Sequence, residues 1–151
     1  MLKQKIAFFI LLPFFFTGCD HISEHFESHS HDDHTASNTG TLSLDGVKKW
    51  KADASTSERI RVMKSITEEY KNRGESLTPA EYHEINMRLS SEVDALIQGC
   101  KMTGPAHDEL HIFLGILNSN ISSLHADDAS KSYKAFTDIE RNLNLFSDYF
   151  E

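Results

Sequence analysis

The stretch TPAEYHEINMRLSSEVDALIQG, residues 78–99, decides the fold because it carries both ends of a helix and the apolar stripe between them. Thr78 is a typical N-cap residue, Pro79 suits the first helical position, and Glu81 lies where a capping box needs a carboxylate. Gly99 is the residue type that most often follows a helix. Between these ends, apolar side chains recur every three or four residues, at Ile85, Leu89, Val93, Leu96 and Ile97. The stretch therefore predicts an amphipathic helix.

Three further segments show the same period, and none shows the alternation of a strand. Their boundaries are marked by Thr56 or Ser57 and Gly74 for the first helix, by Gly104 and Pro105 for the third, and by Asp127 or Asp128 for the fourth. Their apolar stripes are Ile60, Met63, Ile66 and Tyr70; Leu110, Phe113, Leu114, Leu117, Ile121 and Leu124; and Tyr133, Phe136, Ile139, Leu143, Phe146 and Phe150. Four such helices with short links predict an all-α fold, an antiparallel up-down four-helix bundle over residues 55–151.

The N-terminus has the pattern of an export signal. Met1–Lys5 carries two lysines and no acid, and Ile6–Phe16 is an apolar run of 11 residues, shorter than the roughly 20 that a spanning helix needs. Phe16-Thr17-Gly18-Cys19 follows and resembles the lipobox of bacterial lipoproteins, although Phe16 replaces the usual leucine. That resemblance implies a signal peptide over residues 1–18 and palmitate-type acyl chains on Cys19. The alternative is an ordinary signal peptide cleaved elsewhere, with Cys19 incidental.

Lipidation would place the mature chain on a bacterial membrane outside the cytoplasm, inner or outer undetermined. Several acyl chains hold a protein stably at a membrane without a spanning helix. Cleavage before Cys19 leaves 133 residues and takes the net charge from −8 to −10, because Lys3 and Lys5 are lost. An acidic chain without clustered lysine and arginine is poorly suited to bind nucleic acid. We therefore expect a membrane, and no nucleic acid, among its partners.

Residues 19–54 are expected to form a lipid-anchored, His-rich disordered tether and a lead-in to the first helix. Residues 20–43 contain few large apolar side chains, so their burial cannot offset the entropy lost on ordering. Histidines alternate with carboxylates in this part, and five of the nine histidines of the chain lie within it: His21, His25, His29, His31 and His34. Such tracts bind metal ions weakly; the alternative is a polar spacer.

The segment Cys100-Lys101-Met102-Thr103-Gly104-Pro105-Ala106-His107-Asp108-Glu109-Leu110-His111 is the best candidate for a defined site. His107 and His111 are four residues apart, so they share one face of the third helix. Cys100 and Met102 precede them in the link. Thiolate and thioether are soft ligands that favour Cu(I), and imidazole accepts copper or zinc. The four residues form a possible ligand set; each taken alone is more often a packing or surface residue, and Cys100 can instead be buried or paired between chains.

An up-down topology would bring the residues before the first helix to the same end as this segment. Trp50 and Asp53, in Lys48-Lys49-Trp50-Lys51-Ala52-Asp53, would then shield the site. Alternatively, Trp50 only plugs an open bundle end. His83 and His125 fall near the opposite end and are expected to be surface residues.

One further resemblance rests on the pattern Cys-x-Met-x-Gly-x-Ala-His-Asp-x-Leu-His over residues 100–111, together with the upstream Lys-Trp-Lys-Ala-Asp. Over about residues 44–151 the chain looks like small, largely uncharacterised exported helical-bundle proteins encoded near metal-efflux systems. The resemblance implies a heavy-metal context and a metal-efflux assembly as partner, but it assigns no ligands. The chain has no C-x-x-C motif and no Met-rich array, so the resemblance does not identify the metal.

These features together favour a membrane-anchored metal-binding protein, for copper before zinc, that buffers, senses or transfers the ion. The alternative is a structural or adaptor lipoprotein that binds a partner through a bundle face without metal. Haem, held by a His and Met pair, is the least favoured ligand. We expect no enzyme, because the sequence offers no set of nucleophile, base and acid.

Overall fold

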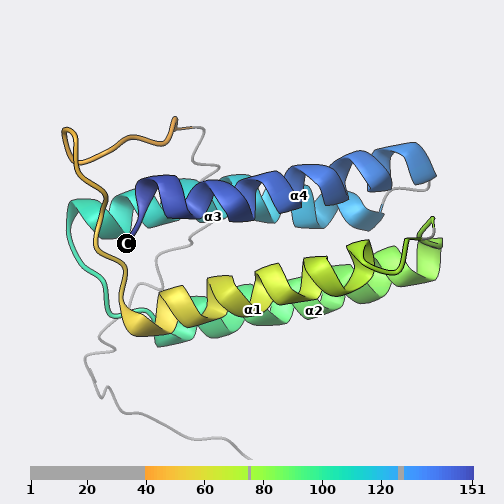
Figure 1. The fold of residues 1–151 in the computed structure, drawn as a ribbon. Coiled ribbons are helices and arrows are strands. Elements are labelled where there is room, and N and C mark those ends of the chain that lie inside the picture. Colours follow the sequence, from red (N-terminus) through yellow and green to blue (C-terminus); the bar gives the residue numbers. More distant parts are fainter. Residues whose placement is uncertain (1–39, 75, 126–127) are drawn as a thin grey trace, which may run out of the picture. The chain divides into compact units, whose positions relative to one another are not determined.

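The computed structural model describes residues 40–74, 76–125 and 128–151. This part of the chain is all-helical, as predicted, and contains no extended strand. Its elements are α1 (Ala54–Lys71), α2 (Pro79–Gly99), α3 (Pro105–Ser122), the short 3-10 helix η1 (Ser123–His125) and α4 (Ala129–Tyr149) (Figure 1). Among these residues no helix is long and apolar enough to cross a membrane.

The N-terminal caps show how the sequence sets the helix starts. Thr78 and Glu81 form the predicted capping box: the Glu81 amide donates to Thr78 Oγ1 over 3.3 Å, and the Thr78 amide donates to Glu81 Oε2 over 2.8 Å. The prediction for α1 was wrong. Asp53, rather than Thr56 or Ser57, caps this helix, because its carboxylate accepts the amide proton of Thr56 over 2.6 Å. Thr56 is fully buried in the first turn.

The helices surround one apolar core that contains nearly all of the predicted stripe residues. Two are on the outside instead: Ile97 is 50% and Tyr133 is 65% exposed. Leu96 already fills the core position on α2, and the next residue lies about 100° further around the helix. On α4 the small residue Ser132 faces inward in place of Tyr133, and its hydroxyl donates to the Leu124 carbonyl over 3.2 Å.

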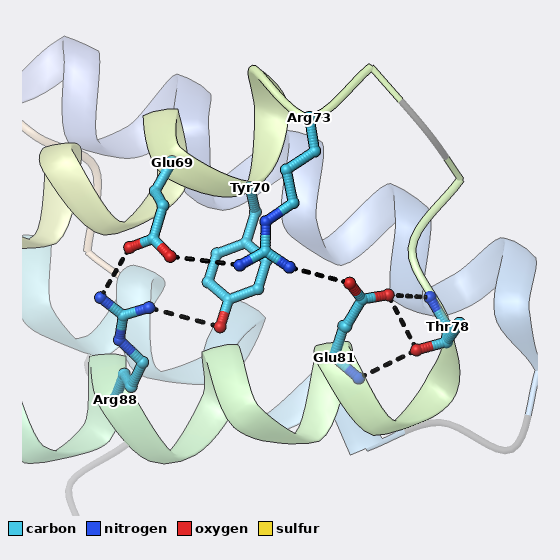
Figure 2. A network of polar contacts seen from close by, with 6 residues as sticks. All are labelled: Glu69, Tyr70, Arg73, Thr78, Glu81 and Arg88. Carbon is cyan, nitrogen blue, oxygen red and sulfur yellow. Dashed lines mark hydrogen bonds and ion pairs between the residues drawn. The ribbon is translucent and has the colours of Figure 1, made fainter.

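The start of α1 lies beside the end of α2, and the end of α1 lies beside the start of α2. At the first place the Lys101 amide donates to Asp53 Oδ2 over 2.6 Å. At the second, Arg73 pairs with Glu81 over 2.9 Å, within a polar network that Figure 2 shows around Tyr70. Helices α3 and α4 pack together in the same domain, and each also contacts α2.

Residues 40–53 lie against the helices, including residues 40–43 at the end of the expected tether; the rest of that tether lies outside the described residues. The Ser43 amide and hydroxyl donate to the two carboxylate oxygens of Glu109 on α3. The side chain of Leu42 packs against the core. Further along, Trp50 pairs with Phe150 in a parallel bridge. The segment therefore forms part of the helical domain, because Ser43 and Leu42 attach it to the helices and Trp50 attaches it to the C-terminus.

Candidate functional site

The Cys100–His111 segment begins at the C-terminal end of α2 and runs into the first turns of α3. Cys100 is the residue that caps α2, and its thiol is free. Cys100 and Met102 are both half-buried and pack against the core. Gly104 has φ +66°, a left-handed conformation that glycine adopts without strain, and the helix follows at once at Pro105. Cys100 and Met102 therefore lie in the short link that leads directly into α3.

His107 and His111 are brought together on α3. Their ring centroids are 4.4 Å apart, and the rings pack edge to face at 78°. The contact follows from their spacing, because residues four apart are neighbours on one face of a helix. Both side chains are half-buried. If one ion is to bind both rings, the rings have to turn until a nitrogen of each points at the same place.

Across the described ranges 40–74, 76–125 and 128–151, no three His, Cys, Asp or Glu side chains are grouped so that they could hold one ion. The two histidines are the part of the expected site that is already assembled. Cys100 and Met102 precede them in the link before α3. The complete four-ligand set stays a prediction.

Asp53 joins the start of α1 to this link. One carboxylate oxygen accepts the Thr56 amide, and the other accepts the Lys101 amide, each over 2.6 Å. Partial burial of the carboxyl opposes its ionisation, but the hydrogen bonds from Lys101 and Thr56 prevail and hold the pKa of Asp53 below its ordinary value of 3.8. Asp53 is therefore ionised at neutral pH and fixes the backbone between Cys100 and Met102.

Trp50 is half-buried beside the C-terminus, and its indole Nε1 donates to the Ser43 carbonyl over 2.8 Å. Ser43 in turn is bound to Glu109, a carboxylate that is only 6% exposed. Glu109 lies between His107 and His111 in sequence, and sequence reasoning missed it. The sequence around Glu109 does not indicate this role, because its partner Ser43 lies 66 residues earlier in the chain. Whether Trp50 shields a bound ion stays a prediction.

The other candidate residues are placed as follows. The tether histidines His21, His25, His29, His31 and His34, and the lipidation candidate Cys19, lie outside the described residues. His83 and His125 are exposed, as expected.

The chain matches no known protein family, no curated protein and no solved structure. One feature that the sequence did not reveal is that His83 and His125 touch each other, with 3.3 Å between their Nδ1 atoms.

Proposed function

We propose that this chain is a membrane-anchored, extracytoplasmic metal-binding protein, with copper favoured over zinc. In this proposal the signal over residues 1–18 directs export, and lipid on Cys19 holds the protein at the membrane. The helices form an antiparallel up-down four-helix bundle carried on the His-rich tether. The contacts between the two ends of α1 and α2, at Asp53 with Lys101 and at Arg73 with Glu81, support an antiparallel pairing of these two helices.

The observation that carries the proposal is the contact between His107 and His111 directly after a link that holds Cys100 and Met102. The donor set suits a soft ion, because thiolate and thioether favour Cu(I) and imidazole binds copper and zinc. The partial burial of Cys100 and Met102 also fits, since a partly dry site protects a soft ion from exchange with water. The protein would hold the bound ion and pass it on, and this role requires no reaction at the ion.

The surrounding residues would position this site. Asp53 holds the Lys101 amide and so limits the movement of the link between the two sulfur ligands. Glu109 anchors Ser43, and with it the segment that carries Trp50, beside the same turns of α3. The tether histidines would collect ions near the membrane surface. These roles together describe a protein that buffers, senses or transfers the ion, with a metal-efflux assembly as its partner.

The test is a titration of the full chain with Cu(I) in the presence of a competing chelator, followed by Zn(II). A variant with Cys100→Ser, His107→Gln and His111→Gln should lose at least tenfold in Cu(I) affinity. A second variant with all five tether histidines changed to Gln should keep the tight ion and lose only the weak, exchangeable ions. Equal Cu(I) affinity of the wild type and this triple variant would refute the proposal.

A second function, that of an adaptor that binds a partner without metal, is supported by a different observation. A pocket of about 760 Å³ opens between the end of α1, the start of α2 and the start of α4. Tyr70, Tyr82 and the exposed Tyr133 line it, and Lys71 pairs with Glu140 at its wall. An aromatic pocket with a few polar groups can receive a side chain of another protein. An adaptor would keep its stability and partner binding after treatment with EDTA, which removes Zn(II), and with a Cu(I) chelator such as bathocuproine disulfonate, whereas a metal carrier would not.

A further inference from the structure

Two histidines from separate elements meet far from the Cys100 link. His83 lies in the second turn of α2, and His125 is the last residue of η1. Their Nδ1 atoms are 3.3 Å apart, and their ring centroids are 4.8 Å apart with the rings tilted by 60°. Cys100 follows the last residue of α2, a helix of 21 residues, so the two places are separated by most of a helix of about 30 Å.

The distance between the two nitrogens is the one that a tetrahedral metal ion requires. Zinc binds imidazole nitrogen at about 2.0–2.1 Å, and two such bonds at a tetrahedral angle place the nitrogens about 3.3 Å apart. The right angle of a square-planar Cu(II) site would bring them to about 2.9 Å. The observed separation of 3.3 Å between the His83 and His125 Nδ1 atoms agrees with the tetrahedral value. We propose that His83 and His125 form a second metal site, selective in geometry for Zn(II).

A direct hydrogen bond between the rings is the competing explanation. It needs one Nδ1 to be protonated and the other to accept, and good hydrogen bonds of this kind have donor and acceptor 2.7–3.2 Å apart, about 2.9 Å at the mode. At 3.3 Å the pair lies at the long end for such a bond, like the Glu81 amide with Thr78 Oγ1, so a weak hydrogen bond fits this spacing as well. Both rings are exposed, so each nitrogen can also bond to water at no cost. The spacing alone therefore fits both explanations, and the response of the two rings to Zn(II) distinguishes them.

The backbones that carry the two rings are fixed by other residues, so the pair is prepared before an ion arrives. The capping box of Thr78 and Glu81 sets the first turn of α2. One turn after His83, the buried Asn86 donates from Nδ2 to the Ile121 carbonyl over 2.7 Å and ties α2 to the end of α3. Next to His125, Leu124 is 2% exposed and its carbonyl accepts the Ser132 hydroxyl. An ion would find both ligands already in place, which reduces the entropy lost on binding.

The space beside the pair suits an ion with open coordination positions. A pocket of about 250 Å³ adjoins both rings, and Tyr82, Leu124 and Ser132 form part of its wall. Two protein ligands leave two positions of a tetrahedral ion for water or a small anion. We therefore expect exchangeable zinc that links α2 to the connection between α3 and α4. This site uses none of the residues of the proposed Cys100 site, so either can exist without the other.

The experiment measures the free energy of unfolding of the full chain in urea, with Zn(II) and with EDTA. The variants are His83→Gln and His125→Gln, each made in a His107→Gln, His111→Gln background in which the other histidine pair cannot bind zinc, and that background is the matched control. Ions on a tether that is equally accessible in folded and unfolded chains do not change stability, whereas an ion bound only to the folded state does. Because His83 and His125 are exposed, their variants should fold as the wild type does, which circular dichroism in EDTA checks.

Free Zn(II) at a hundred times the dissociation constant should lower the unfolding equilibrium constant of the wild type about hundredfold. The control should keep this effect of zinc, and His83→Gln and His125→Gln should each lose most of it. Zinc should also shift the Nδ1 resonances of both rings in ¹⁵N spectra of the wild type. The proposal is overturned if zinc stabilises the two variants as much as the control, or if the Nδ1 resonances do not move. Neither result bears on the Cu(I) affinity of the Cys100 site.

Discussion

The two ends of the helical domain are held by different kinds of interaction. At the Trp50 end, where residues 40–53 meet the C-terminus, backbone groups bond directly: Trp50 donates to Tyr149 over 2.8 Å, Ala52 donates to Glu151 over 2.9 Å, and Glu151 donates back to Trp50 over 2.9 Å. At the Tyr70 end, where α1 meets the start of α2, charged side chains make the connection. Arg73 lies over the Tyr70 ring and pairs with Glu69 and Glu81, and Arg88 pairs with Glu69 (Figure 2).

This difference matters for what each end can do. Backbone hydrogen bonds have a fixed geometry and are little affected by salt, whereas exposed ion pairs contribute little each and are screened. The proposed Cys100 site lies beside the rigid end, where Asp53 fixes the link. The Tyr70 end has a pocket of about 760 Å³, and ion pairs of exposed side chains connect α1 with α2 there. We infer that the Trp50 end suits a fixed ligand set, and the Tyr70 end suits a contact that adapts to its partner.

The largest effect is expected from the aromatic packing beneath the Trp50 end. The centroid of the Phe113 ring lies 5.2 Å from that of Phe146 and 6.3 Å from that of Phe150, and Phe113 is 1% exposed. Phe113→Ala should lower the free energy of unfolding by about 3–5 kcal/mol, because it leaves a cavity in the core. At the Tyr70 end, Tyr133→Ala should change it by less than about 0.5 kcal/mol, since Tyr133 is 65% exposed. Urea denaturation measures both, and similar losses would contradict the assignment of the core.

The next effect concerns Asp53. Asp53→Ala removes the N-cap of α1 and the bond to the Lys101 amide, so we expect a loss of about 2 kcal/mol, at the upper end for a helix cap. Asp128 caps α4 but bonds only within its own first turn, through Ser130. Asp128→Ala should therefore cost clearly less in the same urea measurement. If the two variants lose equal stability, the bond to Lys101 contributes nothing to holding the link.

Most of the helical fold could be predicted from the sequence. The capping box at Thr78 and the start of α3 after Gly104 are local signals, read from a few adjacent residues. Periodicity also identified nearly all of the core, because burial on one face of a helix repeats with the helical turn. It failed at Ile97 and Tyr133, where a neighbouring residue already occupies the inward position.

Less of the candidate site could be predicted, because its contacts join distant parts of the chain. The His107 and His111 pair follows from a spacing of four within one helix, so sequence was sufficient for it. The bond between Ser43 and Glu109, and the meeting of His83 with His125, join residues 66 and 42 positions apart. No local pattern contains such pairs. The topology predicted that Asp53 lies near the link. The sequence did not predict that Asp53 caps α1, because Thr56 and Ser57 are also typical cap residues.

Lowering the pH should reduce the stability contributed at the two ends over different pH ranges. Although desolvation opposes it, hydrogen bonding from Lys101 and Thr56 lowers the pKa of Asp53 below 3.8 in the folded state. A lowered pKa adds stability above the unfolded value, and this stability is lost as the pH falls through the folded value. The stability difference between the wild type and Asp53→Asn should therefore be full at pH 6 and shrink below about pH 4.

Glu81 provides the comparison at the Tyr70 end. Hydrogen bonds from the backbone and hydroxyl of Thr78 lower its pKa from an ordinary value of 4.5, so the contribution of Glu81 should already decline below about pH 4.5. Urea denaturation of Glu81→Gln and Asp53→Asn from pH 6 to pH 2.5 measures the two declines. A difference between the wild type and Asp53→Asn that does not change over this range would show that Asp53 is not stabilised as a carboxylate.

The smallest effects are expected from the exposed ion pairs, and their dependence on salt shows whether Arg88 acts through its charge. Arg88 pairs with Glu69 over 2.9 Å and donates to the Tyr70 hydroxyl over 3.3 Å, and so connects α2 with α1. Arg88→Gln should lower stability in dilute buffer by less than Asp53→Ala does, and most of that loss should vanish in 1 M NaCl, where the screening length is about 3 Å. Arg61→Gln removes the same charge from a pair with Glu58 that lies within α1. It should cost less still, because that pair joins no two helices.

A loss for Arg88→Gln that persists in 1 M NaCl would mean that the guanidinium acts through its packing near the Tyr70 ring, 5.5 Å from the ring centroid, rather than through its charge. In that case the Tyr70 end would depend on packing, as the Trp50 end does, and the contrast between the two ends would be smaller than their hydrogen bonds suggest.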